Sequence, residues 1–245
     1  DSRMLSMGFI PDVKSIIRRT PHKERRQTQL FSATLSEDIQ RLAKSWTLNP
    51  FLVHIKPEEI AVGSVTQEVY LTSENEKFKV LFNILKSEEV TKAIIFVNRR
   101  NQTRDLEENL YRYQISTGLL TGDVPQKRRI RTLQQFKSGK IEVLVATDVA
   151  GRGIHVNDVS HVINFNLPED PEDYVHRIGR TGRAGKKGTA ITFVLKKDNN
   201  CLQEIEKLIK MKIKIFKINL EEQKLKDYEF DTLHESNQIP NFLKR

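Results

Sequence analysis

Six apolar runs recur along the middle of the chain, and segments with helical spacing separate most of them. Several runs are almost continuous in apolar residues, as strands that are covered on both faces must be. Strands that alternate with helices through short connections indicate a parallel α/β sheet flanked by helices. The expected strands are residues 65–71, 93–97, 115–120, 141–146, 161–165 and 189–195.

Apolar stripes at helical spacing mark two of the segments between the runs. In a parallel sheet of this kind, ligand-binding residues lie in the loops beyond the carboxyl ends of the strands. We therefore look for chemistry in the residues that directly follow each predicted strand. The two stripes are Phe78, Leu81, Phe82 and Leu85, and Ile130, Leu133 and Phe136.

The two ends of the chain follow other patterns. Residues 1–48 indicate a helix, a short strand at 29–31 and a second helix with Ser36 as its N-cap. The next residues show no sustained period and contain Pro57 and Gly63, and those beyond about 212 are dense in Lys, Ile and Glu. The chain thus divides into an N-terminal segment (1–49), a linker (50–64), the α/β domain (65–211) and a C-terminal extension (212–245).

The composition of the chain favours a polyanionic partner and argues against disulfides and membrane spans. The 245 residues include 41 Lys and Arg against 32 Asp and Glu, a formal net charge of +9 that favours a polyanionic partner. Cys201 is the only cysteine, which excludes an intrachain disulfide and fits a reducing compartment. No apolar run approaches the roughly 18–20 residues of a membrane span, and no signal-peptide pattern opens the chain. The chain begins at Asp1 without an initiator Met, so we expect it to be part of a longer protein.

The strongest local signal is a series of three arginines, Arg177, Arg180 and Arg183, with glycines between them. At three-residue intervals in a helix they would project along one face. Guanidinium groups that converge on one place match carboxylates or phosphates in their fork geometry. The alternative is the solvated basic end of a surface helix.

Two further signals follow predicted strands. Thr147 and Asp148 end one strand, which places a hydroxyl and a carboxylate at the edge where α/β proteins bind ligands. After another strand, Asp123 is a suitable cap for the next helix. Gln126 and Arg129 then share a face near its N-terminus, where backbone N–H groups attract phosphate. The alternative for this second signal is a well-capped helix with a basic solvent face.

These segments together resemble the ordered motifs of DEAD-box ATP-dependent RNA helicases of superfamily 2. Residues 176–183, His-Arg-Ile-Gly-Arg-Thr-Gly-Arg, look like the HRxGRxxR motif, and 32–34 match Ser-Ala-Thr. Residues 94–98, 121–129 and 146–153 resemble three further motifs in the family's order, and the bacterial RhlB type is the most similar. The resemblance implies a RecA-like C-terminal domain, preceded by a remnant of the first RecA-like domain at 1–49.

The resemblance also implies a role for each matching residue. His155 stands where most members have an Asp that touches the ATP ribose, Asn166 stands where Asp is common, and Gly151 replaces a frequent Ala or Ser. The implied catalytic residues are Arg180 and Arg183, as arginine fingers, with His176; the implied ATP contacts are Arg180, Arg183, Gly153 and His155; the implied RNA contacts are Arg99, Gly122, Gln126, Arg129 and Thr147; and the implied coupling residues are Ser32, Thr34, Asp148 and Arg177.

No Gly-x-x-x-x-Gly-Lys-Ser/Thr sequence occurs in the chain, so the phosphate-binding loop for ATP is missing. We expect ATP and Mg²⁺ to act in the intact protein, with neither held by this chain alone and no metal site within it. The implied partner is single-stranded RNA, bound through its backbone, and a protein partner such as an RNA-degradation assembly is compatible with the family. We expect a cytoplasmic helicase that unwinds or remodels RNA, without a membrane partner. The alternative is a non-catalytic module for RNA binding or partner docking.

Overall fold

The structure is a computed structural model that describes residues 9–31, 37–53, 65–87, 89–151, 156, 158–183 and 186–217. The chain divides into two compact units, Asp1–Lys56 and Pro57–Arg245. Helices dominate the first unit, and the second is built on one sheet.

The first unit contains α2 (Ile10–Arg18), a 3-10 turn (Lys23–Arg25) and α3 (Glu37–Trp46). Arg26 connects the ends of both helices. Its Nη1 donates to the carbonyl oxygen of Ile17 at 3.2 Å, and its Nη2 donates to that of Trp46 at 3.0 Å. Both carbonyls lie in the last turn of a helix, where free acceptors and the helix dipole favour a cation.

The strand predicted at 29–31 is wrong, because these residues form no regular element and the Phe31 side chain is 79% exposed. A strand needs a neighbouring strand to satisfy its backbone N–H and C=O groups. The described residues of this unit contain no strand that could pair with it.

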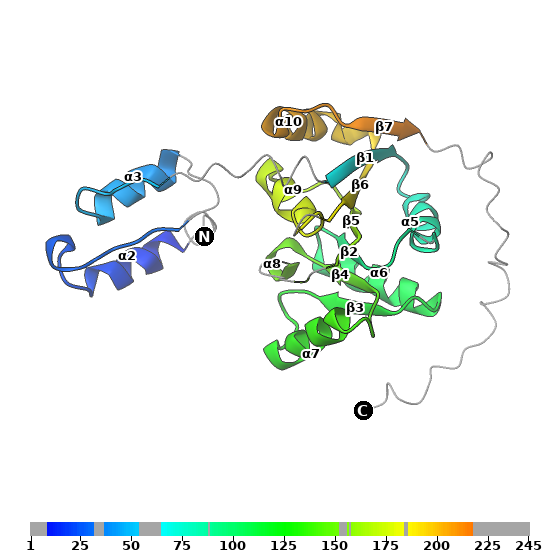
Figure 1. The fold of residues 1–245 in the computed structure, drawn as a ribbon, viewed down its shortest axis with the longest axis horizontal. Coiled ribbons are helices and arrows are strands. Elements are labelled where there is room, and N and C mark those ends of the chain that lie inside the picture. The colour runs from blue at the N-terminus through cyan, green and yellow to red at the C-terminus, as the bar shows by residue number, and fades with distance from the viewer. Residues whose placement is uncertain are drawn as a thin grey trace. The chain divides into compact units, whose positions relative to one another are not determined.

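The second unit is a seven-stranded sheet with the order β3-β4-β2-β5-β6-β1-β7, in which every neighbouring pair is parallel (Figure 1). The six predicted strands are confirmed, with ends that differ by one or two residues. The strands are β1 (Val65–Leu71), β2 (Ala93–Phe96), β3 (Thr117–Leu120), β4 (Val143–Ala146), β5 (His161–Asn164), β6 (Gly188–Val194) and β7 (Lys214–Lys217).

Helices cover both faces of the sheet, and Figure 1 shows α5 and α8 on opposite sides of it. Alternate residues of β2 serve the two faces: Ile95 packs in the cluster with α5 and α6, whereas Ile94 and Phe96 pack in the cluster with α7 and α8. This double burial explains the nearly continuous apolar runs. The helices are α5 (Lys77–Leu85), α6 (Arg100–Arg112), α7 (Gln126–Lys137), α8 (Asp148–Gly151), α9 (Pro171–Ile178) and α10 (Asn199–Ile209), with a 3-10 turn at Lys196–Asp198.

The apolar stripe predicted for α7 is too wide. Phe136 is fully buried and Leu133 partly so, but the Ile130 side chain is 48% exposed. The reason is position, since α7 packs beside β3, the last strand at one edge of the sheet. A helix at an edge has less sheet to cover than a helix over the centre.

The sheet also continues past residue 211, where we expected the domain to end. Strand β7 pairs with β1, and the Phe216 ring stacks on Tyr70 with 5.4 Å between the ring centroids. The Lys-rich alternation of this segment is typical of an edge strand, because lysines on an edge discourage further pairing. Its first residues therefore belong to the sheet, although the sequence pattern assigned them to the extension.

Candidate functional site

Four neighbouring strands bring their following loops to one edge of the sheet. In the order β3-β4-β2-β5, these loops supply Thr121, Thr147, Asn98 and Asn166. The carboxyl ends of parallel strands share an edge, so polar residues far apart in sequence become neighbours there. Thr121, Thr147, Asn98 and Asn166 therefore lie near one another beyond the strand ends.

Arg177 on α9 connects three of these loops. Its Nε and Nη2 donate to the two carboxylate oxygens of Asp148 at 2.6 and 2.7 Å. Nη2 also donates to Asn98 Oδ1 at 2.8 Å, and Nη1 donates to the carbonyl oxygen of Asn166 at 2.7 Å. The guanidinium lies 5.3 Å from the centre of the Phe96 ring, and the side chain is 1% exposed. A buried charge is tolerated only when it is paired and hydrogen-bonded, as it is here.

The prediction that the three arginines lie along one helical face is wrong. Helix α9 ends at Ile178, so Arg180 and Arg183 lie in the turns that follow it, and Arg177 points into the domain. The turn requires Gly182, whose φ of +66° is unfavourable for residues with a side chain. Gly182 therefore turns the backbone between Arg180 and Arg183, beyond the end of α9.

Arg180 and Arg183 line one shallow cavity of about 200 Å³. Arg180 Nε donates to the carbonyl oxygen of His176 at 3.1 Å, and Arg183 Nε donates to that of Gly179 at 2.6 Å. These bonds fix each side chain near its guanidinium. The other lining residues are Thr91, Val156, Asp158, Val159, Ser160, Thr181, Gly182, Lys186 and Lys187.

The cavity is strongly basic, since four cationic side chains line it against the single carboxylate of Asp158. That carboxylate pairs with Lys186, and the contact holds the pKa of Asp158 below its usual value. Burial lowers the pKa of Arg183 from its ordinary value. A partly desolvated guanidinium without a carboxylate among the described residues favours an anionic ligand.

His176 lies on α9, and its carbonyl oxygen accepts the hydrogen bond from Arg180. Its Nδ1 is buried without a hydrogen-bond partner and lies 3.6 Å from Asp173 Oδ1. This separation is too long for a hydrogen bond.

Of the predicted RNA contacts at the opposite, carboxyl edge, Arg99, Gly122 and Gln126 are exposed. Gly122 faces open space, because a Cβ added there would meet no atom within 4 Å. Arg129 is half-buried, and its Nη2 donates to the carbonyl oxygen of Ala150 in α8 at 2.6 Å. Thr147 is buried, with its backbone N–H donating to Leu120 at 3.1 Å.

The prediction that Asp123 caps α7 is wrong. Residue 125 occupies the N-cap position of α7, and no side chain accepts a hydrogen bond there. Asp123 instead accepts a hydrogen bond from Thr121 Oγ1 at 2.6 Å and pairs with Arg104 of α6. The loop after β3 is therefore tied to α6 rather than to the helix that follows.

Comparison with known proteins identifies the family. Residues 76–185 match the helicase conserved C-terminal domain. The ATP-dependent RNA helicase RhlB of Pseudomonas aeruginosa is 54% identical over 211 residues, which cover 86% of this chain and 53% of that protein. The E. coli DEAD-box protein SrmB, solved bound to the regulator of ribonuclease activity A, is 38% identical with a TM-score of 0.59, and the match covers 62% of this chain and 90% of that one.

S. cerevisiae Dbp5 bound to RNA and ADP BeF3 is 32% identical with a TM-score of 0.77, over 88% of this chain and 57% of that one. This chain belongs to the DEAD-box RNA helicase family. It carries the family's C-terminal RecA-like domain and spans about half the length of the curated relatives that it matches.

The DEAD-box motifs fold into two groups, one at the carboxyl edge of the sheet and one at the arginine cavity. Arg99, Gly122, Gln126, Arg129 and Thr147 lie at or just beyond the carboxyl edge, and Arg180 and Arg183 line the cavity. Ser32, Thr34, Gly153 and His155, together with the Ser36 cap, lie outside the described residues.

Sequence reasoning missed Asn98 and the side chains of the cavity wall. Thr181 is buried, and its Oγ1 donates to the carbonyl oxygens of Val159 and Ser160. A Cβ at Gly188 would lie 2.1 Å from that Oγ1, so β6 starts against the arginine turn. The glycine after two lysines was the available signal for this close approach.

Gly151 also has a packing role in this DEAD-box chain. A Cβ there would lie 2.5 Å from Phe96 Cε1, the ring on which Arg177 stacks. Within the described ranges, no group of His, Cys, Asp and Glu side chains is arranged to hold a metal ion. No helix in those ranges combines the length and apolarity needed to cross a bilayer.

Proposed function

We propose that this chain is the C-terminal part of an ATP-dependent helicase that unwinds or remodels RNA. The Arg177 network is the observation that carries this proposal. Arg177 holds Asn98 and Asp148 at the carboxyl edge, and the cavity residue Arg180 follows three positions later. Because the network is buried and bidentate, a displacement of α9 moves both groups of motifs together.

At the carboxyl edge, the proposed ligand is the sugar–phosphate backbone of single-stranded RNA. Exposed Arg99, Gly122 and Gln126 supply a cation, an open backbone surface and an amide, and the net charge of +9 supports a polyanion. Contacts of this kind position a strand without reading its sequence. Arg129 and Thr147 contribute through the positions they hold beside α8.

At the cavity, the proposed ligand is the γ-phosphate of ATP. Arg180 and Arg183 act as arginine fingers, with His176 beside them, and Gly153 and His155 complete the nucleotide contacts. The basic lining fits phosphate oxygens. In this proposal, Mg²⁺ and the phosphate-binding loop belong to the other RecA-like half of the intact protein.

Coupling between the two ligands is proposed to run through Ser32, Thr34, Asp148 and Arg177. Of these, Asp148 and Arg177 form the buried pair described above. Hydrolysis that changes the cavity contacts would shift α9, and through Arg177 the loops at the carboxyl edge. We propose a cytoplasmic location for the protein, in keeping with an RNA substrate.

The test is RNA-stimulated ATP hydrolysis by the intact protein beside this 245-residue chain. The intact protein should hydrolyse ATP, and the chain alone should not. Arg183→Ala in the intact protein should lower kcat by about 10³-fold or more, as loss of an arginine finger does, while RNA affinity stays within about twofold. Activity that survives this substitution would remove the finger role from Arg183.

The alternative is a non-catalytic module for RNA binding or partner docking, for example to an RNA-degradation assembly. SrmB, which was solved with a bound regulator, supports the docking part of this alternative. An intact protein that binds RNA but shows no ATP turnover under any RNA stimulation would favour the module.

A further inference from the structure

Strand β3 leaves one side of its backbone open. Within the described residues it is the edge strand of the sheet and pairs only with β4. The carbonyl oxygens of Ser116 and Leu120 accept from β4 or the residue after it. Since alternate residues of a strand direct their backbone groups to the same neighbour, those of Thr117 and Leu119 face away from the sheet.

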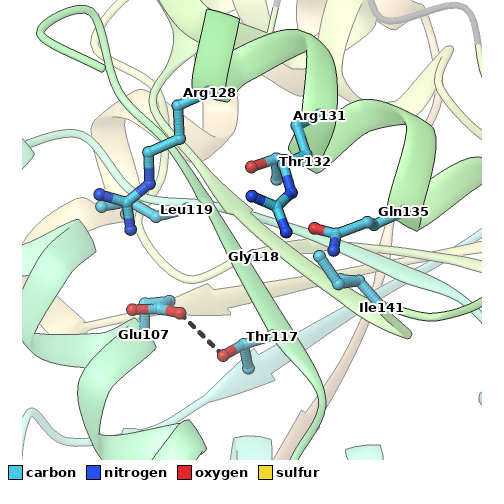
Figure 2. A pocket seen from close by; sticks show the side chains of 9 residues that line it. All are labelled: Glu107, Thr117, Gly118, Leu119, Arg128, Arg131, Thr132, Gln135 and Ile141. Atoms are coloured by element: carbon cyan, nitrogen blue, oxygen red, sulfur yellow. Dashed lines mark hydrogen bonds between the residues drawn. The ribbon is translucent and has the colours of Figure 1, made fainter. Parts of the chain in front are cut away.

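A groove of about 320 Å³ follows this open edge between α6 and α7, and Figure 2 shows its lining. The strand forms the floor, with helices as walls. None of the lining residues belongs to the proposed RNA or ATP contacts. They are Glu107 of α6, Thr117, Gly118 and Leu119 of β3, Arg128, Arg131, Thr132 and Gln135 of α7, and Ile141.

The two arginines of the groove have no anionic partner among the described residues. Arg128 and Arg131 are exposed, and Figure 2 shows their guanidinium groups extending from α7 over the strand. Glu107, on the facing wall, accepts a hydrogen bond from Thr117 Oγ1 at 2.9 Å. The α7 wall is therefore positive and unpaired, and the α6 wall carries a carboxylate that is already bonded.

Gly118 permits this arrangement. A Cβ at this position would lie 2.7 Å from Thr132 Cγ2 and 3.0 Å from Ile141 Cδ1. The missing side chain lets α7 pack close to the edge strand, which brings arginines three residues apart on α7 over the strand. The groove thus combines the unpaired backbone edge of β3 with two cationic side chains, Arg128 and Arg131, on one wall.

We propose that this groove binds an extended acidic peptide of a protein partner, which adds to β3 as a further strand. The partner's backbone would pair with the outward N–H and C=O groups of Thr117 and Leu119, as in other cases of strand addition. Side chains of an added strand alternate between the two walls. Acidic residues at every second position would then meet Arg128 and Arg131.

RNA fits this groove less well than a peptide. A phosphate backbone offers acceptors but no N–H donors, so it leaves the outward carbonyl oxygens without partners. In addition, Gln135 and Ile141 extend the lining toward the amino end of the sheet, away from the loops proposed to hold RNA.

The test uses three fluorescein-labelled decapeptides in which Val alternates with Glu, Gln or Lys, and anisotropy with the 245-residue chain as the readout. The Glu peptide should bind roughly tenfold more tightly than the Gln peptide, because each carboxylate gains a charge-assisted bond. Arg128→Glu with Arg131→Glu should reverse the preference toward the Lys peptide. Equal binding of the Glu and Gln peptides would overturn the proposal.

Strand addition is tested separately from charge. Leu119→Pro removes one outward N–H while retaining both arginines, and an edge strand tolerates Pro where the N–H faces solvent. It should abolish binding of the Glu peptide. Amide hydrogen exchange of Thr117 and Leu119 in the unaltered chain should slow by about tenfold or more when the peptide is bound. Unchanged exchange at both amides would mean that no strand is added.

A charge-matched control is Lys196→Glu with Lys197→Glu, at exposed residues of the turn after β6. This control should leave peptide binding unchanged. An oligouridylate is the competing probe. If the groove double variant loses oligouridylate affinity as strongly as Arg129→Ala does, the groove is a path for RNA and the peptide proposal is wrong.

Discussion

Arg177 brings a full positive charge into a site where its side chain is 1% exposed. Asp148, Asn98 and Asn166 offset the cost of burying this charge, because together they accept hydrogen bonds from all three guanidinium nitrogens. The planar fork matches this set of acceptors, and a lysine ammonium does not. At the scale of single residues, this contact joins three of the loops at the carboxyl edge.

We expect Arg177→Lys to lower the free energy of unfolding by about 3 kcal/mol, because a single ammonium leaves part of the buried set unpaired. Urea unfolding of the chain measures the change. Arg180→Lys, in the turn beyond α9, is the matched control and should cost less than about 1 kcal/mol. Equal losses from the two substitutions would mean that the Arg177 network adds no particular stability.

His161 at the start of β5 gives the domain a dependence on pH. Burial lowers the pKa of His161 below its usual 6.5. The folded state thus binds this proton more weakly than the unfolded state, so stability is complete above that value and declines as the pH falls through it toward the folded pKa. Unfolding free energies at about pH 7.5 and pH 5.5 should differ, and His161→Gln should reduce the difference.

A pH dependence unchanged in His161→Gln would assign the effect to other groups. Ser160 Oγ lies 3.0 Å from His161 Nδ1 and can orient the neutral ring. Ser160→Ala is therefore a second variant that should alter stability at both pH values without removing the titration.

At the scale of elements, the two proposed binding surfaces of α7 lie on different sides of the helix. Its first turn carries Gln126 and Arg129 near the carboxyl edge of the sheet, whereas Arg128 and Arg131 line the groove beside β3. The helical repeat separates adjacent residues by about 100°, which places neighbours in sequence on different faces. One helix can therefore contact RNA and a peptide without competition.

We expect Arg129→Ala to weaken binding of single-stranded RNA of any sequence, and to flatten the slope of log K against log salt by about 0.7 through loss of one phosphate contact. Gln126→Ala should weaken binding without changing the slope, since an amide releases no counterion. Titrations at several salt concentrations measure both. Arg131→Ala serves as the control on the same helix, and a slope change there equal to that of Arg129→Ala would contradict the division of α7.

The sequence predicted the positions of helices and strands better than it predicted the contacts of single residues. Double burial produces continuous apolar runs, and this pattern located β1 to β6 to within two residues. Edges were less predictable, because β7 reads as a Lys-rich tail and Ile130 was expected to be buried. Both errors concern the two edges of the sheet, where burial is incomplete and the periodic signal weakens.

At the scale of the whole molecule, the two units differ in what holds them together. Among the described residues, all buried apolar side chains lie at residue 65 or beyond, and Thr47 is the only buried residue of the first unit. Hydrophobic burial is the main stabilising term in a domain. The second unit therefore contains the core, and the first is held by polar contacts such as those of Arg26.

We accordingly expect a chain of residues 65–217 to fold, with a Tm within about 4 °C of that of the full chain. Circular dichroism on heating compares the two. Limited trypsin digestion should also leave a core of this extent, since its backbone is protected in the sheet. A truncated chain without a cooperative transition would show that residues outside 65–217 are needed for folding.

The sequence by itself determined the class of fold, the positions of strands β1 to β6 and the family, because burial periodicity and ordered motifs are local properties of a chain. Tertiary structure alone decided which motif residues are structural and which are accessible. Arg177 became a buried connector because three loops converge on it, and Arg180 and Arg183 entered a cavity because Gly182 turns the chain after α9. The groove beside β3 arises from the strand order, which places four residues at an edge and two arginines above them.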